Sequence, residues 1–517
     1  MSRFPKGGAG WRRPAPPSLA LVAGILVALL ALIPFFFIVA ESIQTDWATM
    51  SRLLFRPRMG ELASNTVRLI AASLPLCAII GVGAAWLTQR TMLPGRRVWN
   101  FLLVAPLAVP AFVNSFGWVT WFGEKVEGYG GAVVIVTLSY FPLVYLPVAA
   151  ALRGLDQALE ESARALGHGP GRTFLRVTLP QLRPALFGGL LLVALHLLAE
   201  FGALELLRFP TFTVAIFESY QSTFNGPAAT SLAGVLVLSC LLLLLLEVLL
   251  RGRVRYARIG AGVTRQVTPV RLGLATPFAL LALAALLGLA LGVPLVSLGR
   301  WLVISRTTAF PLGELASVTM RSIGLGLLGA LVTTALALPV VWVAVRRGGW
   351  LAFLVERSTY LGHTLPGIVV ALALVTFGIR YARPIYQTTA LLLIAYAILF
   401  MPLAVVSIRA ALVQVPPSLD EAARALGARP LAVFWRVTLP LLARGLGAGG
   451  TLVFLAVITE LTATLLLAPT GTVTLASRFW SRTNDIAYGA AAPYALLMIV
   501  LSAPTTLLLT RDARRAQ

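Results

Sequence analysis

Twelve apolar runs, each long enough to cross a bilayer, constrain the fold of this chain more than any other feature of its sequence. About 20 consecutive apolar residues span the hydrocarbon core as an α-helix, and backbone in lipid must satisfy its own hydrogen bonds, which favours helices. The runs lie near residues 18–40, 63–88, 99–122, 129–152, 184–207, 229–250, 272–298, 316–345, 351–378, 388–412, 443–468 and 486–510. The sequence therefore predicts an all-α polytopic membrane protein with about twelve transmembrane helices.

The composition supports this class. The 517 residues are 58% hydrophobic and only 12% charged, whereas ordinary globular proteins are about 25% charged. A net charge of +23 would suggest nucleic acid in a soluble protein. Here most basic residues fall in alternate connecting segments, so we interpret the charge as a positive-inside signal. We expect both termini in the cytoplasm of a multi-pass protein of the bacterial inner membrane, contacts with lipid, and no nucleic-acid partner.

The chain also contains an internal repeat. Residues 161–180 and 421–440 are identical at thirteen of twenty positions without a gap, at an offset of 260. The same offset pairs Pro106 with Pro366. Because six spans separate the two copies, both begin on the same side of the membrane, which predicts two parallel six-helix repeats.

This repeat divides the chain into three predicted regions. Residues 1–250 form the first half, residues 251–271 a basic cytoplasmic connector, and residues 272–517 the second half. The strongest internal identity lies in two connecting loops, at about 153–183 and 413–443. We expect a chain that retains identity in such loops to bind a partner there.

Each of these loops predicts a helical elbow. A short amphipathic helix ends at Gly167 or Gly427, because glycine suits the left-handed turn that closes a helix, and a second amphipathic piece follows. In the second copy, Ser418 and Glu421 have the spacing of a capping box.

The elbow sequence resembles the EAA loop of binding-protein-dependent ABC importer permeases. That pattern is Glu-x-Ala-x-x-x-Gly, nine residues, a branched apolar residue, one residue and Leu-Pro. The matching residues are Glu161, Ala163, Gly167, Val177, Leu179 and Pro180, and then Glu421, Ala422, Ala423, Gly427, Val437, Leu439 and Pro440. The first copy departs at Ser162, and both copies have valine for isoleucine. The resemblance covers nearly the whole chain, as a type I ABC importer permease with two fused halves.

The resemblance implies that each elbow is a coupling helix that docks on one subunit of an ABC ATPase dimer. The residues expected to serve this coupling are Glu161, Ala163, Arg164, Gly167, Glu421, Ala423, Arg424 and Gly427. The alternative for each Glu–Arg pair is a local i,i+3 ion pair. A Walker A loop needs Gly-Lys followed by Ser or Thr, and neither Lys6 nor Lys125 has that context. We therefore expect no cofactor in this chain, and ATP and Mg to be used by the partner.

Glu200 and Glu460 lie within predicted spans at repeat-equivalent positions, where an ionised group by default marks function. The sequence AEFGALELLRFPTFT, from Ala199, resembles the ferric-iron branch of the family. Ferric iron suits carboxylates, so the two glutamates are candidates for the translocation pathway. The alternative is packing or gating, because similar segments occur in permeases for other substrates, and no metal ligand is firmly identified.

These observations predict a permease that receives substrate, ferric iron first, from a periplasmic binding protein and moves it inward by alternating access. Thiamine, a polyamine or an anion is the alternative cargo. A twelve-helix secondary transporter shares the six-plus-six plan, but leaves the duplicated elbow without an explanation. A membrane enzyme would need a convergent catalytic set, which the sequence does not supply.

Overall fold

The computed structural model describes residues 18–44, 51–52, 55–155, 157–221, 226–251, 269–304 and 310–515. These residues are helical apart from their connections and one isolated parallel bridge, Thr91 to Val270. Most of the predicted connector, residues 252–268, lies outside the described part.

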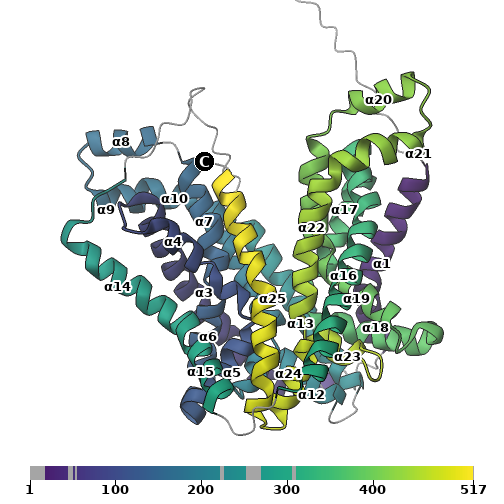
Figure 1. Cartoon of the computed structure of the whole chain (residues 1–517), viewed down its shortest axis with the longest axis horizontal. Helices are drawn as coiled ribbons and strands as arrows, with labels where there is room; N and C mark the ends of the chain where they lie inside the picture. Colours follow the sequence, from purple (N-terminus) through teal and green to yellow (C-terminus); the bar gives the residue numbers. More distant parts are fainter. Residues whose placement is uncertain are drawn as a thin grey trace, which may run out of the picture. The chain divides into compact units, whose positions relative to one another are not determined.

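The helices of the first half (Figure 1) are α1 (Ser18–Gln44), α3 (Pro57–Arg90), α4 (Arg96–Leu102), η1 (Ala105–Ala108), α5 (Ala111–Phe122), η2 (Gly123–Val126), α6 (Tyr129–Tyr140), α7 (Pro142–Gly154), α8 (Gln157–Ala165), α9 (Pro170–Thr173), η3 (Phe174–Thr178), α10 (Leu179–Ala199), α11 (Gly202–Leu206), α12 (Phe212–Gln221) and α13 (Gly226–Arg251). Those of the second half are η4 (Gly273–Ala275), α14 (Thr276–Leu287), η5 (Gly288–Gly292), α15 (Val293–Ile304), α16 (Leu312–Trp342), η6 (Val343–Arg347), α17 (Gly349–Thr364), α18 (Gly367–Tyr381), η7 (Arg383–Ile385), α19 (Thr389–Val413), α20 (Pro417–Ala425), α21 (Pro430–Val433), η8 (Phe434–Thr438), α22 (Leu439–Thr459), α23 (Thr462–Leu467), α24 (Leu475–Asn484) and α25 (Tyr488–Arg515).

Within the described residues, nine helices are long and apolar enough to cross a membrane, or eleven if each of two broken pairs counts as one span. These spans follow the predicted apolar runs in order. At the twelfth run lies the shorter apolar helix Tyr488–Pro504, part of α25. The predicted all-α polytopic fold is confirmed.

Prolines interrupt two of the predicted runs. In the run at 99–122 the chain bends by 88° between η1 and α5, and Pro110 at the N-cap of α5 has ψ 142°. Pro366 holds the same place before α18, with ψ 144°. Proline has no N–H to donate and cannot continue a helix from the preceding turn. The structural counterpart of Pro366 is therefore Pro110, rather than Pro106 as the sequence offset indicated.

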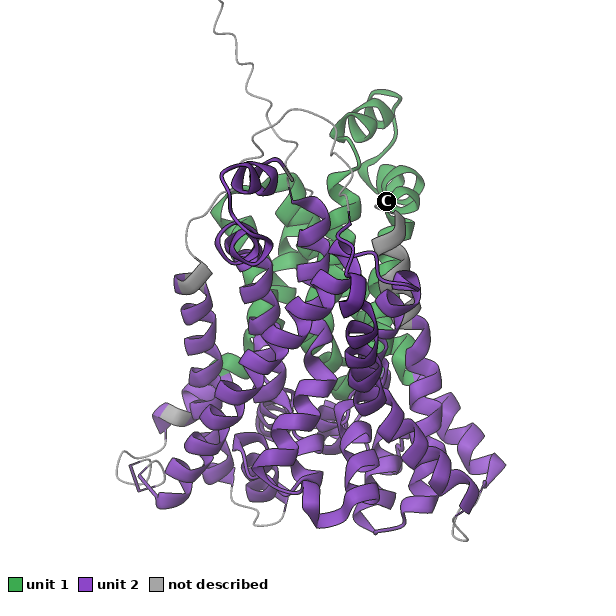
Figure 2. Cartoon of the chain, turned by 90° about the vertical axis from the view of Figure 1, so that its left-hand side faces the viewer, with its two compact units in different colours: residues 1–36, 325–363, 390–457 green, residues 37–324, 364–389, 458–517 purple. Residues whose placement is uncertain are grey.

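The chain forms two compact units (Figure 2). Unit 1 comprises residues 1–36, 325–363 and 390–457, and unit 2 comprises residues 37–324, 364–389 and 458–517. Each unit thus combines segments of both sequence halves.

The first helix of each half packs against helices of the other half. In unit 1, a Cβ added at Gly24 of α1 would lie 3.4 Å from the carbonyl oxygen of Pro339 in α16. In unit 2, a Cβ at Gly117 of α5 would lie 2.5 Å from Cα of Pro294 in α15. The α1 and α15 helices have therefore exchanged partners between the halves.

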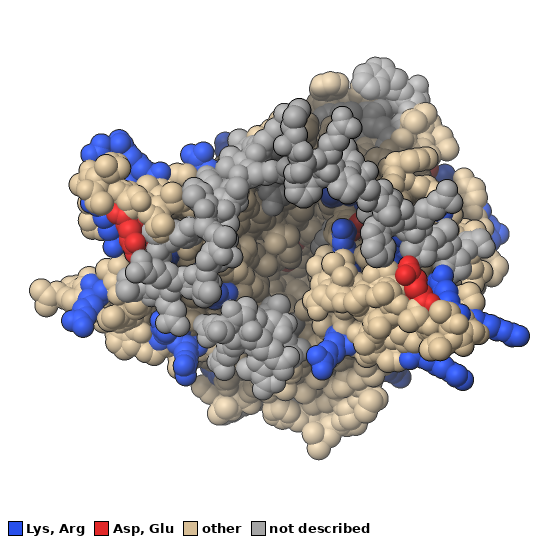
Figure 3. All heavy atoms as spheres, turned by 90° about the horizontal axis from the view of Figure 1, so that it is seen from above, with Lys and Arg blue, Asp and Glu red and all other residues tan. Residues whose placement is uncertain are grey.

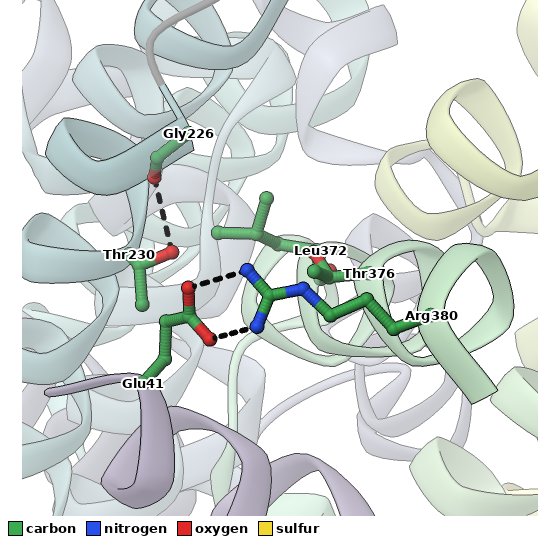
Figure 4. Close-up of polar contacts among 6 residues, drawn as sticks. All are labelled: Glu41, Gly226, Thr230, Leu372, Thr376 and Arg380. Carbon is green, nitrogen blue, oxygen red and sulfur yellow. Dashed lines mark hydrogen bonds and ion pairs between the residues drawn. The ribbon is translucent and has the colours of Figure 1, made fainter. Parts of the chain in front are cut away.

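The C-terminal part of α1, from Phe37, belongs to unit 2 and ends in an ion pair with two hydrogen bonds. Arg380 of α18 donates from Nη1 and Nη2 to the two carboxylate oxygens of Glu41, at 2.8 and 3.0 Å (Figure 4). Such bidentate pairs fix geometry as well as adding energy. The pair ties the end of α1 to the end of α18.

Unit 2 holds the first elbow on a bundle of α3, α7 and α10. A Cβ at Gly81 of α3 would lie 2.8 Å from Cβ of Val144, and one at Gly189 of α10 would lie 2.9 Å from Cα of the same valine. Interiors packed this closely transmit displacement rather than absorb it. The three helices therefore form a firm base for the elbow.

Candidate functional site

The two elbows end their first helices with the same turn. Gly167 has φ +84° and Gly427 φ +82°, the left-handed region that favours glycine. In the first copy the N–H groups of Gly167 and His168 donate to the carbonyls of Arg164 and Ala163, at 2.9 and 3.1 Å. The second copy repeats both bonds at 2.9 and 3.1 Å. This is the Schellman arrangement, as expected for the glycine turn.

The start of the second elbow differs from the prediction. Helix α20 begins at Pro417 with Pro416 as its N-cap, and no side chain caps it. The predicted capping box is therefore wrong: Ser418 already lies inside the first turn, because proline is well suited to the first helical position.

The predicted docking residues are mostly exposed. Glu161, Arg164, Glu421 and Arg424 are all exposed, and no ion pair among the described residues joins either predicted Glu–Arg pair. The equivalent alanines of the two helices are less exposed: Ala163 is buried and Ala423 is half-buried. At the tip of each elbow, Leu166 is 81% exposed and Leu426 is 89% exposed.

The residue before each predicted glutamate makes the ion pair instead. In the first copy, Arg90 Nη2 at the end of α3 lies 3.3 Å from Glu160 Oε1. The Thr178 hydroxyl donates to the same oxygen at 2.9 Å. We call Arg90, Glu160 and Thr178 the first anchor. Both charged side chains are largely buried, with 6% and 13% exposed.

The second anchor consists of Arg346, Asp420 and Thr438. Arg346 Nη2 in η6 lies 3.5 Å from Asp420 Oδ2, with 6% and 5% of the side chains exposed. The Thr438 hydroxyl donates to Asp420 Oδ1 at 3.0 Å. Two anchors of the same chemistry therefore connect the two elbows to the second helix of each half.

An aromatic contact accompanies each anchor. The rings of Trp86 and Phe174 meet edge to face at 6.5 Å, and those of Trp342 and Phe434 at 6.0 Å. Sequence reasoning missed both anchors. A signal existed, because Trp86 and Trp342, like Arg90 and Arg346, share an offset of 256.

A pocket of about 780 Å³ lies beside the first anchor. Apolar residues of α3, including Ile79, Val82 and Trp86, form one wall, and the elbow forms the other. Val270, at the end of the predicted connector, also lines it. The N–H of Val270 donates to the carbonyl of Arg90 at 2.8 Å.

The two glutamates predicted for the pathway hold the N-termini of short helices. Glu200 Oε1 accepts the N–H of Ala203 at 2.9 Å, and the Tyr140 hydroxyl donates to its other oxygen. Glu460 accepts the N–H groups of Ala463 at 2.7 Å and Thr464 at 2.9 Å. A carboxylate at a helix N-terminus is favourable because it satisfies free N–H groups and faces the positive end of the dipole.

The segments that follow Glu200 and Glu460 in the chain contact each other in unit 2. A Cβ at Gly202 would lie 2.9 Å from Cβ of Phe112 and 3.0 Å from Cδ2 of Leu461. The rings of Phe112 and Phe479 lie 5.6 Å apart, and those of Phe201 and Trp480 lie 5.2 Å apart. We call Phe112, Phe116, Phe201, Phe479 and Trp480, all buried, the aromatic plug. Glu200 and Glu460 thus support the two segments that border this plug.

The described residues contain no group of three or more His, Cys, Asp or Glu side chains that could hold a metal ion. On the face drawn in Figure 3, Lys and Arg side chains outnumber Asp and Glu. Helix α8 of unit 2 lies toward this face (Figure 1).

Comparison with known proteins places these features in a family. The model of the binding-protein-dependent transport system inner membrane component matches residues 78–256 and 337–516. The Fe(3+)-transport system permease protein FbpB 2 of Haemophilus influenzae is 38% identical over 501 residues, covering 96% of this chain and 99% of the relative. The ferric transport system permease protein FbpB of Actinobacillus pleuropneumoniae is 24% identical over 530 residues, covering 93% and 76%. The sulfate transport system permease protein CysT of Escherichia coli is 29% identical over 242 residues, covering 43% and 86%.

The family model matches twice, once in each sequence half, and the duplicated elbow lies inside both matches. The helices and this match together make the chain a multi-pass inner-membrane protein. It is a permease with two fused halves, and it belongs to the family of binding-protein-dependent transport system inner membrane components.

Proposed function

We propose that this chain is the permease subunit of an ATP-driven ABC importer for ferric iron. The observation that carries the choice of cargo is the 38% identity, over 96% of this chain, to a permease named for Fe(3+) transport. The cargo would arrive on a periplasmic binding protein, and both termini would lie in the cytoplasm, as the positive-inside signal favours.

The elbows are the proposed docking sites for the ATPase dimer. Each presents an exposed leucine, Leu166 or Leu426, on a helix whose end is fixed by a left-handed glycine. Leu159 and Leu419 on the same helices are exposed as well, and an exposed apolar surface rimmed by polar residues is typical of a protein-interaction site. The exposed Glu161 and Glu421 would add charge complementarity around it. ATP hydrolysis would then belong to the partner subunit.

The aromatic plug is the proposed gate. Glu200 and Glu460 would keep α11 and α23 in place at its border, and their oxygens are already engaged by N–H and hydroxyl groups. This supports a gating role for the two glutamates over direct contact with iron. Alternating access requires two discrete arrangements of such an element.

Reconstitution tests the proposal. The permease with its ATPase and binding protein, in proteoliposomes loaded with ATP and Mg, should take up ferric iron and hydrolyse ATP only when iron-loaded binding protein is outside. Liposomes loaded with ADP are the control. Coupled uptake of another cargo, with none of iron, would contradict the ferric assignment.

An oxyanion is the second candidate cargo. It is favoured by the 29% identity of half of the chain to a permease named for sulfate transport. The same vesicles, supplied with sulfate- or molybdate-loaded binding protein, distinguish the two: competition or uptake by the anion would favour this alternative.

A further inference from the structure

Helix α8, the first coupling helix, packs mainly on its own elbow, and both the first anchor and the Trp86–Phe174 ring contact join that elbow to α3. Helix α8 packs on α9 and η3 of its own elbow, and the pocket of about 780 Å³ separates the elbow from the wall of α3. Arg90 and Glu160 bridge the edge of that pocket at 3.3 Å. A movement of α8 can therefore be passed directly to α3 through this ion pair.

Unit 1 repeats the arrangement. Helix α20 packs on α21 and η8 of its own elbow, and Arg346 connects Asp420 to the end of the α16–η6 helix at 3.5 Å. In both copies a threonine of the following π-helical turn donates to the acid, Thr178 or Thr438. Each acid is thus joined both to the second helix of its half and to the turn that continues into the next span.

Stability alone does not explain these pairs. Burying two charges costs about as much as their attraction returns, and apolar residues of similar volume are often as stable. Within the described residues, Nε and Nη2 of both Arg90 and Arg346 are buried without a hydrogen bond, so neither guanidinium is fully satisfied. What each pair does supply is a direct contact, at 3.3 or 3.5 Å, between the acid of the elbow and the end of α3 or of the α16–η6 helix.

We infer that the two anchors are the connections through which movement of the coupling helices reaches α3 and α16. Arg90, Glu160, Arg346 and Asp420 are then positioning residues for transport, separate from the exposed residues that dock the ATPase. This assignment rests on the proposed function, because it presupposes that an ATPase moves the elbows.

The test is the variant Glu160→Gln/Asp420→Asn, which removes both acids' charge and keeps their shape. Reconstituted with ATPase and binding protein, it should retain the ATPase on purification and continue to hydrolyse ATP. Cargo transported per ATP should fall about fivefold or more, the range of a typical coupling free energy. Glu61→Gln, which neutralises an exposed ion pair with Arg58 at 3.0 Å, is the matched control and should leave the ratio unchanged.

Charge reversal provides a second variant that remains informative if the first is poorly folded. Arg90→Glu/Glu160→Arg restores an opposite-charge pair and should recover most of the transport-to-ATP ratio, whereas Glu160→Arg alone should not. If the pair had only a structural role, Arg90→Glu/Glu160→Arg would recover the yield and thermal stability lost in Glu160→Arg. The ratio of transported cargo to hydrolysed ATP would then not differ between the two variants.

Three results would overturn the inference. They are a wild-type ratio in Glu160→Gln/Asp420→Asn, loss of the ATPase from that variant on purification, or a folded charge-reversal variant that stays uncoupled. A wild-type complex without ATP-dependent uptake of any cargo would instead refute the proposed function, so the two failures are distinguishable.

Discussion

At the scale of single residues, the elbows show which positions their local sequence defines. Gly167 and Gly427 adopt φ +84° and +82° with nothing within 4 Å of an added Cβ. Glycine is therefore required at these positions by the left-handed backbone conformation, since a side chain would have room. A glycine after an amphipathic helix signals this turn, and the prediction was confirmed in both copies.

The replacement Gly167→Ala tests that requirement. A side chain at this φ costs about 1–2 kcal/mol, so the end of α8 should loosen and Leu166 should lose its fixed place. We expect weaker retention of the ATPase in a pull-down, with membrane insertion unchanged. Gly169→Ala is the matched control, because Gly169 has φ −65° and open space around it. Equal retention by the two variants would contradict the prediction.

Other residues could be assigned only from the fold. The alternative role of Glu161 and Glu421, a local ion pair with Arg164 and Arg424 three positions along the same helix, does not occur among the described residues. The observed ion pairs join the preceding acids, Glu160 and Asp420, to arginines more than sixty positions earlier. Local spacing shows which side chains share a helix face, but it does not show which distant helix end that face meets.

At the scale of elements, prolines and short helices shape unit 2. Pro110 turns one predicted span by 88°, and this bend places Phe112 beside Gly202. The short helices α11 and α23 begin two residues after Glu200 and Glu460, whose carboxylates accept N–H groups of the first helical turn. The sequence identified both glutamates as candidates. Their bonds to helix N–H groups depend on the ends of α10 and α22 at Ala199 and Thr459, which lie inside continuous apolar runs and which hydropathy does not show.

The replacement Gly202→Ala should disturb the aromatic plug. Its Cβ would lie 2.9 and 3.0 Å from Phe112 and Leu461, and overpacking of this kind costs about 1–3 kcal/mol. We expect a lower thermal midpoint and a measurable ion leak from proteoliposomes without ATP. Gly188→Ala in α10 has nothing within 4 Å and should cause neither change. Tight vesicles and an unchanged midpoint for Gly202→Ala would exclude the plug as a gate.

At the scale of the whole molecule, the sequence halves and the compact units differ. Duplication predicts two similar halves, whereas each unit combines segments of both, because α1 and α15 pack against helices of the other half. Through this exchange the two halves are held together by packing between helices. The end of the connector nevertheless contacts the first anchor, through Val270 and the carbonyl of Arg90.

The proposed orientation is open to thiol labelling. The native Cys77 and Cys240 are buried, at 0% and 1% exposed, so background labelling should be low. With a membrane-impermeant maleimide, Leu166→Cys should react only in inverted vesicles, because the positive-inside rule places the elbows in the cytoplasm. Phe310→Cys, at a position 53% exposed, should react only in right-side-out vesicles. The opposite pattern would reverse the topology.

The sequence by itself determined the membrane class, the order of the apolar runs, the duplication and the two glycine-ended elbows. Each of these depends on hydropathy, on internal identity or on a residue with one backbone preference, and such properties act over a few turns of chain. Only the tertiary structure decided which acids of the elbows are paired, that Glu200 and Glu460 accept helix N–H groups, and that the halves exchange their first helices. These features depend on which distant surfaces come into contact, and that is set by the packing of all helices together.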